Sequence, residues 1–161
     1  GWADRHPITP PYSLVAWGRL SAAQRQVAYA LAAPEELLPP PTAPVQPDPA
    51  LSLALLHHQA PVGWVLAQRT DPEGVRYFGL HVDPAHRGRG RGPVMVHEAF
   101  RRLHAGAIPI ARAAIEDGNA AMARLLRRHL AHHLEAIGAS RVSRCDGASP
   151  APAESSPSPL C

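Results

Sequence analysis

The sequence contains no lysine, so all sixteen of its basic residues are arginine. It also contains a single asparagine, Asn119, but 19 prolines. This usage is typical of proteins encoded by GC-rich genes, which means that codon choice accounts for part of the arginine content. The formal charge of +3 is therefore weak support for nucleic-acid binding. The absence of lysine also excludes the Walker phosphate loop, whose Gly-Lys-Ser/Thr ending requires one.

Cysteines and long apolar runs are scarce as well. The two cysteines, Cys145 and Cys161, both lie near the C-terminus without metal-ligand spacing, which argues against a zinc site or a disulfide framework. No stretch reaches the roughly 18 consecutive apolar residues that a transmembrane helix needs, and the N-terminus has no signal-peptide pattern. We therefore expect a soluble, cytoplasmic protein without a metal ion.

Hydrophobic periodicity predicts strands and helices within one domain, residues 1–138, which includes a loop at 34–50 with seven prolines. The expected strands are 11–17, 51–58, 62–69, 75–82 and 108–115, and the expected helices are 21–33, 93–104 and 119–136. A capping box formed by Ser21 and Gln24 marks the start of the first helix. Residues 139–161 are rich in Ser, Pro and Ala, and we expect a disordered tail there because they have little apolar surface to bury.

Glycine and arginine alternate in the segment RGRGRG, residues 87–92, between an expected strand and an expected helix. The first turn of a helix has N–H groups without intrahelical acceptors, and the aligned peptide dipoles favour an anion there. The three glycines lack the Cβ atoms that would keep a diphosphate away from those donors. Arg87, Arg89 and Arg91 add positive charge. Pro93 is expected at the first helical position, where its missing N–H costs nothing.

A flexible arginine–glycine loop that contacts nucleic acid is the alternative interpretation of residues 87–92. The repeat is short, and aromatic residues make up only 5% of the chain, so base stacking has little support. We therefore expect no nucleic-acid partner. His129, His132 and His133 have a helical spacing that a metal site can use. No cysteine stands near them in the sequence, so we interpret them as a solvated helix face.

The segment LHVDPAHRGRGRGPVMVHEAF resembles motif A of the GNAT superfamily of acyl-CoA-dependent N-acyltransferases. It contains the pattern Arg-x-x-Gly-x-Gly, here Arg87, Gly90 and Gly92. The pattern Val-x-Pro precedes it, here Val82 and Pro84. The order of the flanking strands and helices is also similar to that of the family.

This resemblance implies a GNAT-like α/β fold, in which a mixed central sheet is splayed near its fourth strand and flanked by helices. It also implies that the backbone amides of motif A hold the diphosphate of coenzyme A, and that the strand ending at Val82 hydrogen-bonds the pantetheine arm. Acetyl-CoA is then the co-substrate. The residues that the resemblance assigns to the coenzyme are Val82, Arg87, Gly88, Arg89, Gly90, Arg91, Gly92 and Asn119, the last one at the pantetheine or adenylate end.

The usual catalytic residues of the family are missing. Family members often carry a tyrosine seven residues after the asparagine, where this chain has Leu126. They often carry a glutamate on a central strand, where this chain has Gly79 or Ala114. Many also end with a two-strand hairpin that completes the acceptor site, and here that hairpin is reduced or missing.

Three other residues are the nearest candidates for catalysis: His81, Glu116 and Tyr77. Attack of an amine on a thioester needs a group that takes a proton from the ammonium. Histidine side chains titrate near neutral pH, so His81 can be that base. Glu116 stands at the end of the fifth expected strand. Tyr77 is expected on the same strand face as Gly79 and His81, because side chains alternate every two residues.

The leading hypothesis is an N-acetyltransferase that acts on a primary amine of a small molecule or peptide. The alternative is a GNAT-like domain that binds acyl-CoA as a sensor or partner module without efficient turnover. A homodimer could cover the sheet edge that a missing hairpin exposes. We expect no membrane partner.

Overall fold

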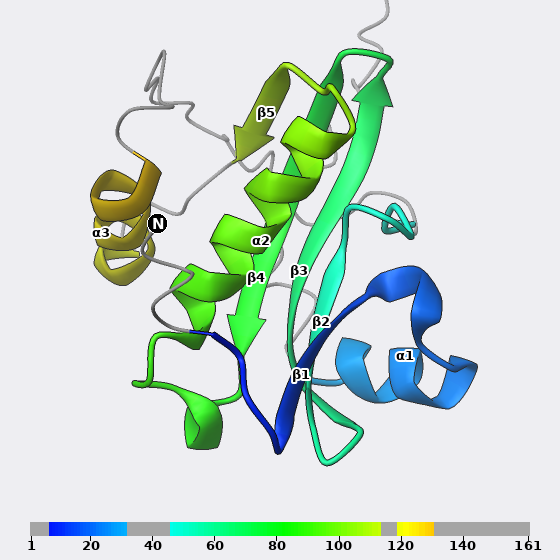
Figure 1. Ribbon diagram of the computed structural model, residues 1–161, viewed down its shortest axis with the longest axis vertical. Coiled ribbons are helices and arrows are strands. Elements are labelled where there is room, and N and C mark those ends of the chain that lie inside the picture. Colours follow the sequence, from blue (N-terminus) through cyan, green and yellow to red (C-terminus); the bar gives the residue numbers. More distant parts are fainter. Residues whose placement is uncertain (1–6, 32–45, 114–118, 131–161) are drawn as a thin grey trace, which may run out of the picture. The chain divides into compact units, whose positions relative to one another are not determined.

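The structure is a computed structural model, and it describes residues 7–31, 46–113 and 119–130 (Figure 1). All of these belong to the first of the two units into which the chain divides, Gly1–Ala131. The strands are β1 (Tyr12–Ala16), β2 (Leu53–His57), β3 (Ala60–Asp71), β4 (Gly74–Val82) and β5 (Ile110–Ala113). The helices are the 3-10 turns η2 (Trp17–Arg19) and η4 (Pro84–His86) and the α-helices α1 (Ala22–Tyr29), α2 (Arg91–Ala105) and α3 (Ala120–Leu130).

The strands form one mixed sheet in the order β1-β2-β3-β4-β5. The first four pair antiparallel, whereas β5 runs parallel to β4 and pairs with residues 74–77. Among the described residues, the C-terminal half of β4 therefore has a neighbouring strand, β3, on one side only. The predicted α/β fold with a mixed sheet flanked by helices is confirmed. The segments where a C-terminal hairpin or tail was considered lie outside the described residues.

Each face of the sheet has its own apolar cluster, because neighbouring residues of a strand point to opposite faces. Helix α1 covers one face, where the indole N–H of Trp64 donates to the carbonyl of Ala28 at 2.9 Å. Helix α2 covers the other face, as Figure 1 shows. The α1-side cluster consists of Trp17, Leu20, Ala28, Ala54, Leu56, Trp64, Leu66 and Phe78, and the α2-side cluster of Leu53, Leu55, Val62, Val65, Met95 and Ala99.

A β-bulge in β4 changes which of its residues share a face. The register between β3 and β4 shifts after Leu66, which makes Phe78 an extra residue in β4. Tyr77 packs with the α2-side cluster. His81 instead stacks on Trp64 on the α1 side, with the ring centroids 5.5 Å apart. The expectation that Tyr77 and His81 share a face is wrong, because the bulge shifts the two-residue alternation by one.

The helices begin close to their predicted starts. The capping box is confirmed, since the Ser21 hydroxyl accepts from the Gln24 N–H and the Gln24 side chain accepts from the Ser21 N–H. Helix α2 begins at Arg91, so Pro93 is its third residue. The expectation that Pro93 is the first residue of the helix is therefore wrong. Pro93 still lies in the first turn, where an N–H has no intrahelical acceptor, so the helix tolerates it. None of the described helices is both long and apolar enough to span a membrane.

Candidate functional site

The RGRGRG segment joins β4 to α2 at one end of the sheet (Figure 1). Asp83 shapes the connection that precedes it. Its N–H donates to the carbonyl of Val62 at 2.8 Å, and its carboxylate accepts from the N–H of Ala85 at 2.9 Å. The N–H of His86 then donates to the carbonyl of Asp83 at 2.8 Å. These bonds fix the path of the chain from the strand end into η4.

We call residues 87–92 the glycine turn. Gly88 and Gly90 have φ angles of +83° and +72°, a backbone conformation that other residues rarely adopt. A Cβ added at Gly88 would meet nothing within 4 Å, so its α-carbon faces open space. The first backbone bond of α2 runs from the Val94 N–H to the Gly90 carbonyl at 3.2 Å. The glycine turn therefore offers the N–H donors of the first helical turn, and space for an anion, at the positive end of a helix dipole.

The three arginines of the glycine turn differ in what they contact. Arg87 donates from Nε to the carbonyl of Val82 at 2.6 Å. Arg91 donates from Nη1 to the carbonyl of His86 at 2.8 Å. Arg89 is exposed. Two of the positive charges are thus held close to the end of β4 and to η4, and the third is accessible to a ligand.

Tyr12 of β1 reaches the glycine turn, although it is far away in the sequence. Its hydroxyl is hydrogen-bonded to Nδ1 of His86 at 2.8 Å, and Cζ of Arg91 lies 3.8 Å from the centroid of its ring. The ring of His57 lies 4.6 Å from that of Tyr12 and 4.9 Å from that of His86. Burial lowers the pKa of His57, and the nearby His58, His86 and Arg91 lower it further. His57 is therefore a neutral neighbour of the turn near pH 7.

His81 lies one residue before the end of β4, next to the point where the chain enters the glycine turn. Its side chain is partly buried and stacks on Trp64. The backbones of β3 and β4 approach closely here, because a Cβ added at Gly63 would lie 2.8 Å from the carbonyl oxygen of His81. A glycine is thus needed at position 63 to keep His81 in place.

Tyr77 is bound to α2 on the opposite face. Its hydroxyl donates to the carbonyl of Ala99 at 3.3 Å. Burial raises the pKa of Tyr77, and the negative charge of Asp48 adds to the effect. The tyrosine is therefore a neutral hydrogen-bond donor that connects β4 to α2, and the structure does not bring it together with His81.

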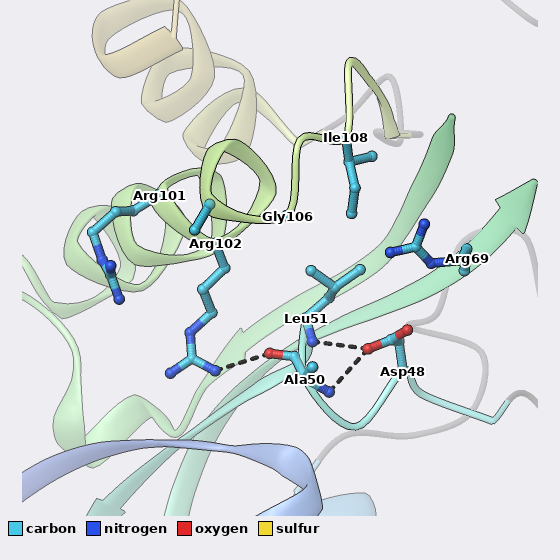
Figure 2. Close-up of a pocket in the computed structure, with 9 residues that line it drawn as sticks. Asp48, Ala50, Leu51, Arg69, Arg101, Arg102, Gly106 and Ile108 are labelled. Carbon is cyan, nitrogen blue, oxygen red and sulfur yellow. Dashed lines mark hydrogen bonds between the residues drawn. The ribbon is translucent and has the colours of Figure 1, made fainter. Parts of the chain in front are cut away.

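A hollow of about 410 Å³ lies at the other end of α2 (Figure 2). Arg101 and Arg102 line it, but both bind the carboxylate of Glu98, at 2.6 and 2.9 Å. Arg102 also donates to the carbonyl of Ala50 at 2.8 Å. The hydrogen bond from Arg101 lowers the pKa of Glu98. The Glu98 carboxylate offsets part of the charge of these two arginines, and Arg102 also connects the end of α2 to Ala50, so the glycine turn is the better site for an anion.

The chain matches the model of the acetyltransferase (GNAT) family over residues 17–132, which is most of its length. It belongs to the GNAT acetyltransferase family. The matched range includes β4, the glycine turn and α2. The resemblance that motif A carried in the sequence is therefore confirmed.

Solved structures share the fold of this GNAT chain. The ribosomal-protein-S18-alanine N-acetyltransferase from Escherichia coli has a TM-score of 0.58 and 16% identity, over 73% of this chain and 75% of that one. The GCN5-related N-acetyltransferase from Sphaerobacter thermophilus has a TM-score of 0.60 and 18% identity, over 76% and 42%. Ard1 from Thermoplasma volcanium has a TM-score of 0.57 and 12% identity, over 73% and 80%. At these identities the likeness shows the fold alone. A comparison with curated protein sequences gives no match.

The remaining predicted site residues are Asn119, which the GNAT resemblance assigned to the coenzyme, and Glu116, a candidate for catalysis. The side-chain oxygen of Asn119 accepts from the N–H of Met122 at 3.0 Å, and its carbonyl accepts from the N–H of Ala123 at 3.1 Å. Asn119 is therefore the N-cap of α3. Glu116 lies outside the described residues.

Proposed function

We propose that this GNAT protein transfers an acetyl group from acetyl-CoA to a primary amine of a small molecule or peptide. The observation that supports the proposal most directly is the glycine turn at the start of α2. It combines two residues of positive φ, an α-carbon that faces open space and a cluster of arginines. A diphosphate carries at least two negative charges and several acceptor oxygens, so these features fit it.

In this proposal the turn binds the diphosphate through its backbone N–H groups. Arg89 is exposed and can contact a phosphate directly, whereas Arg87 and Arg91 contribute charge from fixed positions. Asn119 uses its oxygen to cap α3, which leaves its amide NH₂ as a donor for the pantetheine or adenylate end. The proposed coenzyme residues are Val82, Arg87, Gly88, Arg89, Gly90, Arg91, Gly92 and Asn119.

The C-terminal half of β4 is suited to the pantetheine arm. Among the described residues, β5 pairs with β4 along residues 74–77 only, and β4 continues to Val82. In the C-terminal half of β4, the backbone groups that point away from β3 can then pair with the amide groups of an extended ligand. Acetyl-CoA, when bound, supplies the thioester whose acetyl group is transferred.

His81 is the residue that we propose as the general base. It lies on β4 directly before Val82, and a neutral imidazole can accept the proton that the attacking ammonium must lose. Glu116 remains a second candidate for proton transfer. Tyr77 is not included, because its buried hydroxyl is bound to Ala99 on the other face of the sheet. Much of the rate acceleration can come from holding the amine and the thioester together.

The test is a calorimetric titration of the full chain with acetyl-CoA, followed by an assay of thiol release on a panel of amines. The panel includes small polyamines, aminoglycosides and peptides with a free N-terminus. Binding together with thiol release on at least one amine is the expected result. Binding without release on any amine contradicts the transferase proposal and leaves a coenzyme-binding module. The absence of binding contradicts the coenzyme site itself.

A further inference from the structure

Tyr12, His86 and Arg91 form a closed set of contacts in which each residue touches the other two. Tyr12 binds His86 through its hydroxyl at 2.8 Å. Cζ of Arg91 lies 3.8 Å from the centroid of the Tyr12 ring. Arg91 in turn donates to the carbonyl of His86 at 2.8 Å. We call this set the Tyr12 clamp.

The clamp contacts the chain on both sides of the two glycines of positive φ, Gly88 and Gly90. His86 directly precedes the turn, and Arg91 is the first residue of α2. Between them lie only residues 87–90, and two of these are glycines of positive φ. Glycine loses more conformational freedom on ordering than any other residue, so such a segment is costly to hold in one shape. A contact that fixes its two ends removes part of that cost before a ligand arrives.

Tyr12 comes from a part of the sheet that is remote from the turn in the sequence. It is the first residue of β1, and β1 and β4 are not neighbours in the strand order. His57 supports the tyrosine ring from the next strand, at 4.6 Å. The paired end of β1 and β2 thus positions the Tyr12 ring beside the glycine turn.

We propose that Tyr12 is a positioning residue for the coenzyme, which acts through Arg91 and His86 to keep the glycine turn in its binding shape. This inference rests on the proposed function, because it names what organises that same site. Arg91 then serves the coenzyme in two ways, by its charge beside the turn and by its contact with Tyr12. An arginine can do both, because its planar guanidinium stacks on an aromatic ring and still donates hydrogen bonds in its own plane.

Two substitutions at position 12 separate the contacts of the clamp. Tyr12→Phe keeps the ring under Arg91 and loses the bond to His86, whereas Tyr12→Leu loses both. We expect the Kd for acetyl-CoA to rise by roughly threefold in Tyr12→Phe and roughly tenfold in Tyr12→Leu, in line with the loss of one or two such contacts. The kcat at saturating acetyl-CoA should stay unchanged, because Tyr12 contacts the residues on either side of the glycines and not His81, the proposed base.

The matched control is Tyr29→Leu. Tyr29 is an exposed tyrosine on α1 whose ring contacts that of Trp17 at 5.1 Å, so this variant removes an aromatic side chain away from the turn. Its Kd for acetyl-CoA should equal that of the wild type. Urea denaturation identifies any variant that fails to fold, and Arg91→Lys provides a second way to break the clamp while it preserves the charge. A wild-type Kd in folded Tyr12→Leu and Arg91→Lys would overturn the proposal.

A second measurement tests the clamp without the coenzyme. Backbone ¹⁵N relaxation of the ligand-free chain reports the order of the N–H groups at residues 87–92. We expect lower order parameters there in Tyr12→Leu than in the wild type or in Tyr29→Leu. If wild-type protein fails to bind acetyl-CoA but Tyr12→Leu loosens the turn, the proposed function is wrong and the clamp stands. If order is unchanged in Tyr12→Leu, the clamp is wrong whatever the wild type binds.

Discussion

His81 and Tyr77 both lie on β4, yet one extra residue, Phe78, places them on opposite faces of the sheet. On the α1 side, His81 stacks on Trp64 close to the strand end that enters the glycine turn. On the α2 side, Tyr77 binds the backbone of the helix. The two residues therefore have separate roles, and substitutions at each should affect different quantities.

Replacement of His81 should affect the chemical step. We expect His81→Gln to lower kcat by at least about 100-fold, which is typical for the loss of a general base. The Kd for acetyl-CoA should not change, since the glycine turn is intact. Steady-state kinetics and calorimetry measure the two quantities. His104→Gln, an exposed histidine near the far end of α2, is the control. A kcat within twofold of wild type would remove His81 from the mechanism.

Replacement of Tyr77 should affect stability. Tyr77→Phe removes the hydroxyl that donates to the Ala99 carbonyl, and we expect it to lower the free energy of unfolding by about 1 kcal/mol. The kcat should stay the same. Urea denaturation and the thiol-release assay provide the two values. A large drop in kcat with unchanged stability would show that Tyr77 takes part in catalysis after all.

The sequence predicts the residues of the glycine turn better than those around it. The turn is local, so its glycines, arginines and position before a helix are visible in one short segment. The contact of Tyr12 with Arg91 depends on how distant strands are arranged, and no spacing rule reveals it. The bulge at Phe78 is also hidden, because the apolar pattern of β4 is compatible with an unbroken strand.

At the scale of elements, contacts at its start, middle and end connect α2 to the rest of the described structure. The Tyr12 clamp holds its start, Tyr77 binds it at Ala99, and Arg102 fixes its last turns to the carbonyl of Ala50 (Figure 2). Because the glycine turn is continuous with α2, any movement of the helix would move the donors of the site. Stability of the far end is thus linked to the geometry of the turn.

The ion pairs at that far end give a pH-dependent prediction. The hydrogen bond from Arg101 lowers the pKa of Glu98 in the folded chain. A carboxyl with a lowered pKa contributes stability above its unfolded pKa, and this contribution is lost as the pH falls through the folded pKa. We expect Glu98→Gln to cost about 0.5–1 kcal/mol at pH 7, as partly exposed pairs do.

The difference between Glu98→Gln and the wild type should shrink as the pH falls below the unfolded pKa of Glu, about 4.3, and through the lower folded pKa of Glu98. Urea denaturation at pH 7 and pH 3 provides the comparison. Glu73→Gln, at an exposed turn between β3 and β4, serves as the control for the loss of one negative charge. An equal loss of stability at both pH values would contradict the role of the ionised carboxylate.

Over the described residues, the order of the strands and helices could be predicted almost completely from the sequence. The residues at which each one begins and ends could be predicted less well. Capping and proline signals act within a few residues, which is why α1 and α2 begin within two residues of their predicted starts. The end of α1 at Tyr29 comes earlier than expected. The apolar spacing continues beyond it, but spacing alone does not say where a helix stops packing against the sheet.

At the scale of the whole molecule, the sheet brings the ends of β1, β2 and β4 to the side where the glycine turn lies. Tyr12, His57 and Val82 come from these three ends. Membership of the GNAT acetyltransferase family explains why the turn is there, and the distant tyrosine explains how this chain holds it. The acceptor amine is set by surfaces that the sequence motifs do not encode, so it could not be predicted from them.

The central claim is that the glycine turn binds the diphosphate of acetyl-CoA, and a pair of substitutions at Gly88 tests it most directly. Asn and Asp have nearly the same shape, and both tolerate positive φ better than other side chains. A side chain at this position extends into open space. Gly88→Asn therefore controls for the backbone and the added bulk, and Gly88→Asp adds only a negative charge.

Calorimetric titration of both folded variants with acetyl-CoA is the decisive measurement. A carboxylate close to a diphosphate is repelled by about 1 kcal/mol or more, so we predict that Gly88→Asp binds at least about fivefold more weakly than Gly88→Asn. Equal affinities of the two variants, both matching the wild type, would contradict the account and place the coenzyme elsewhere.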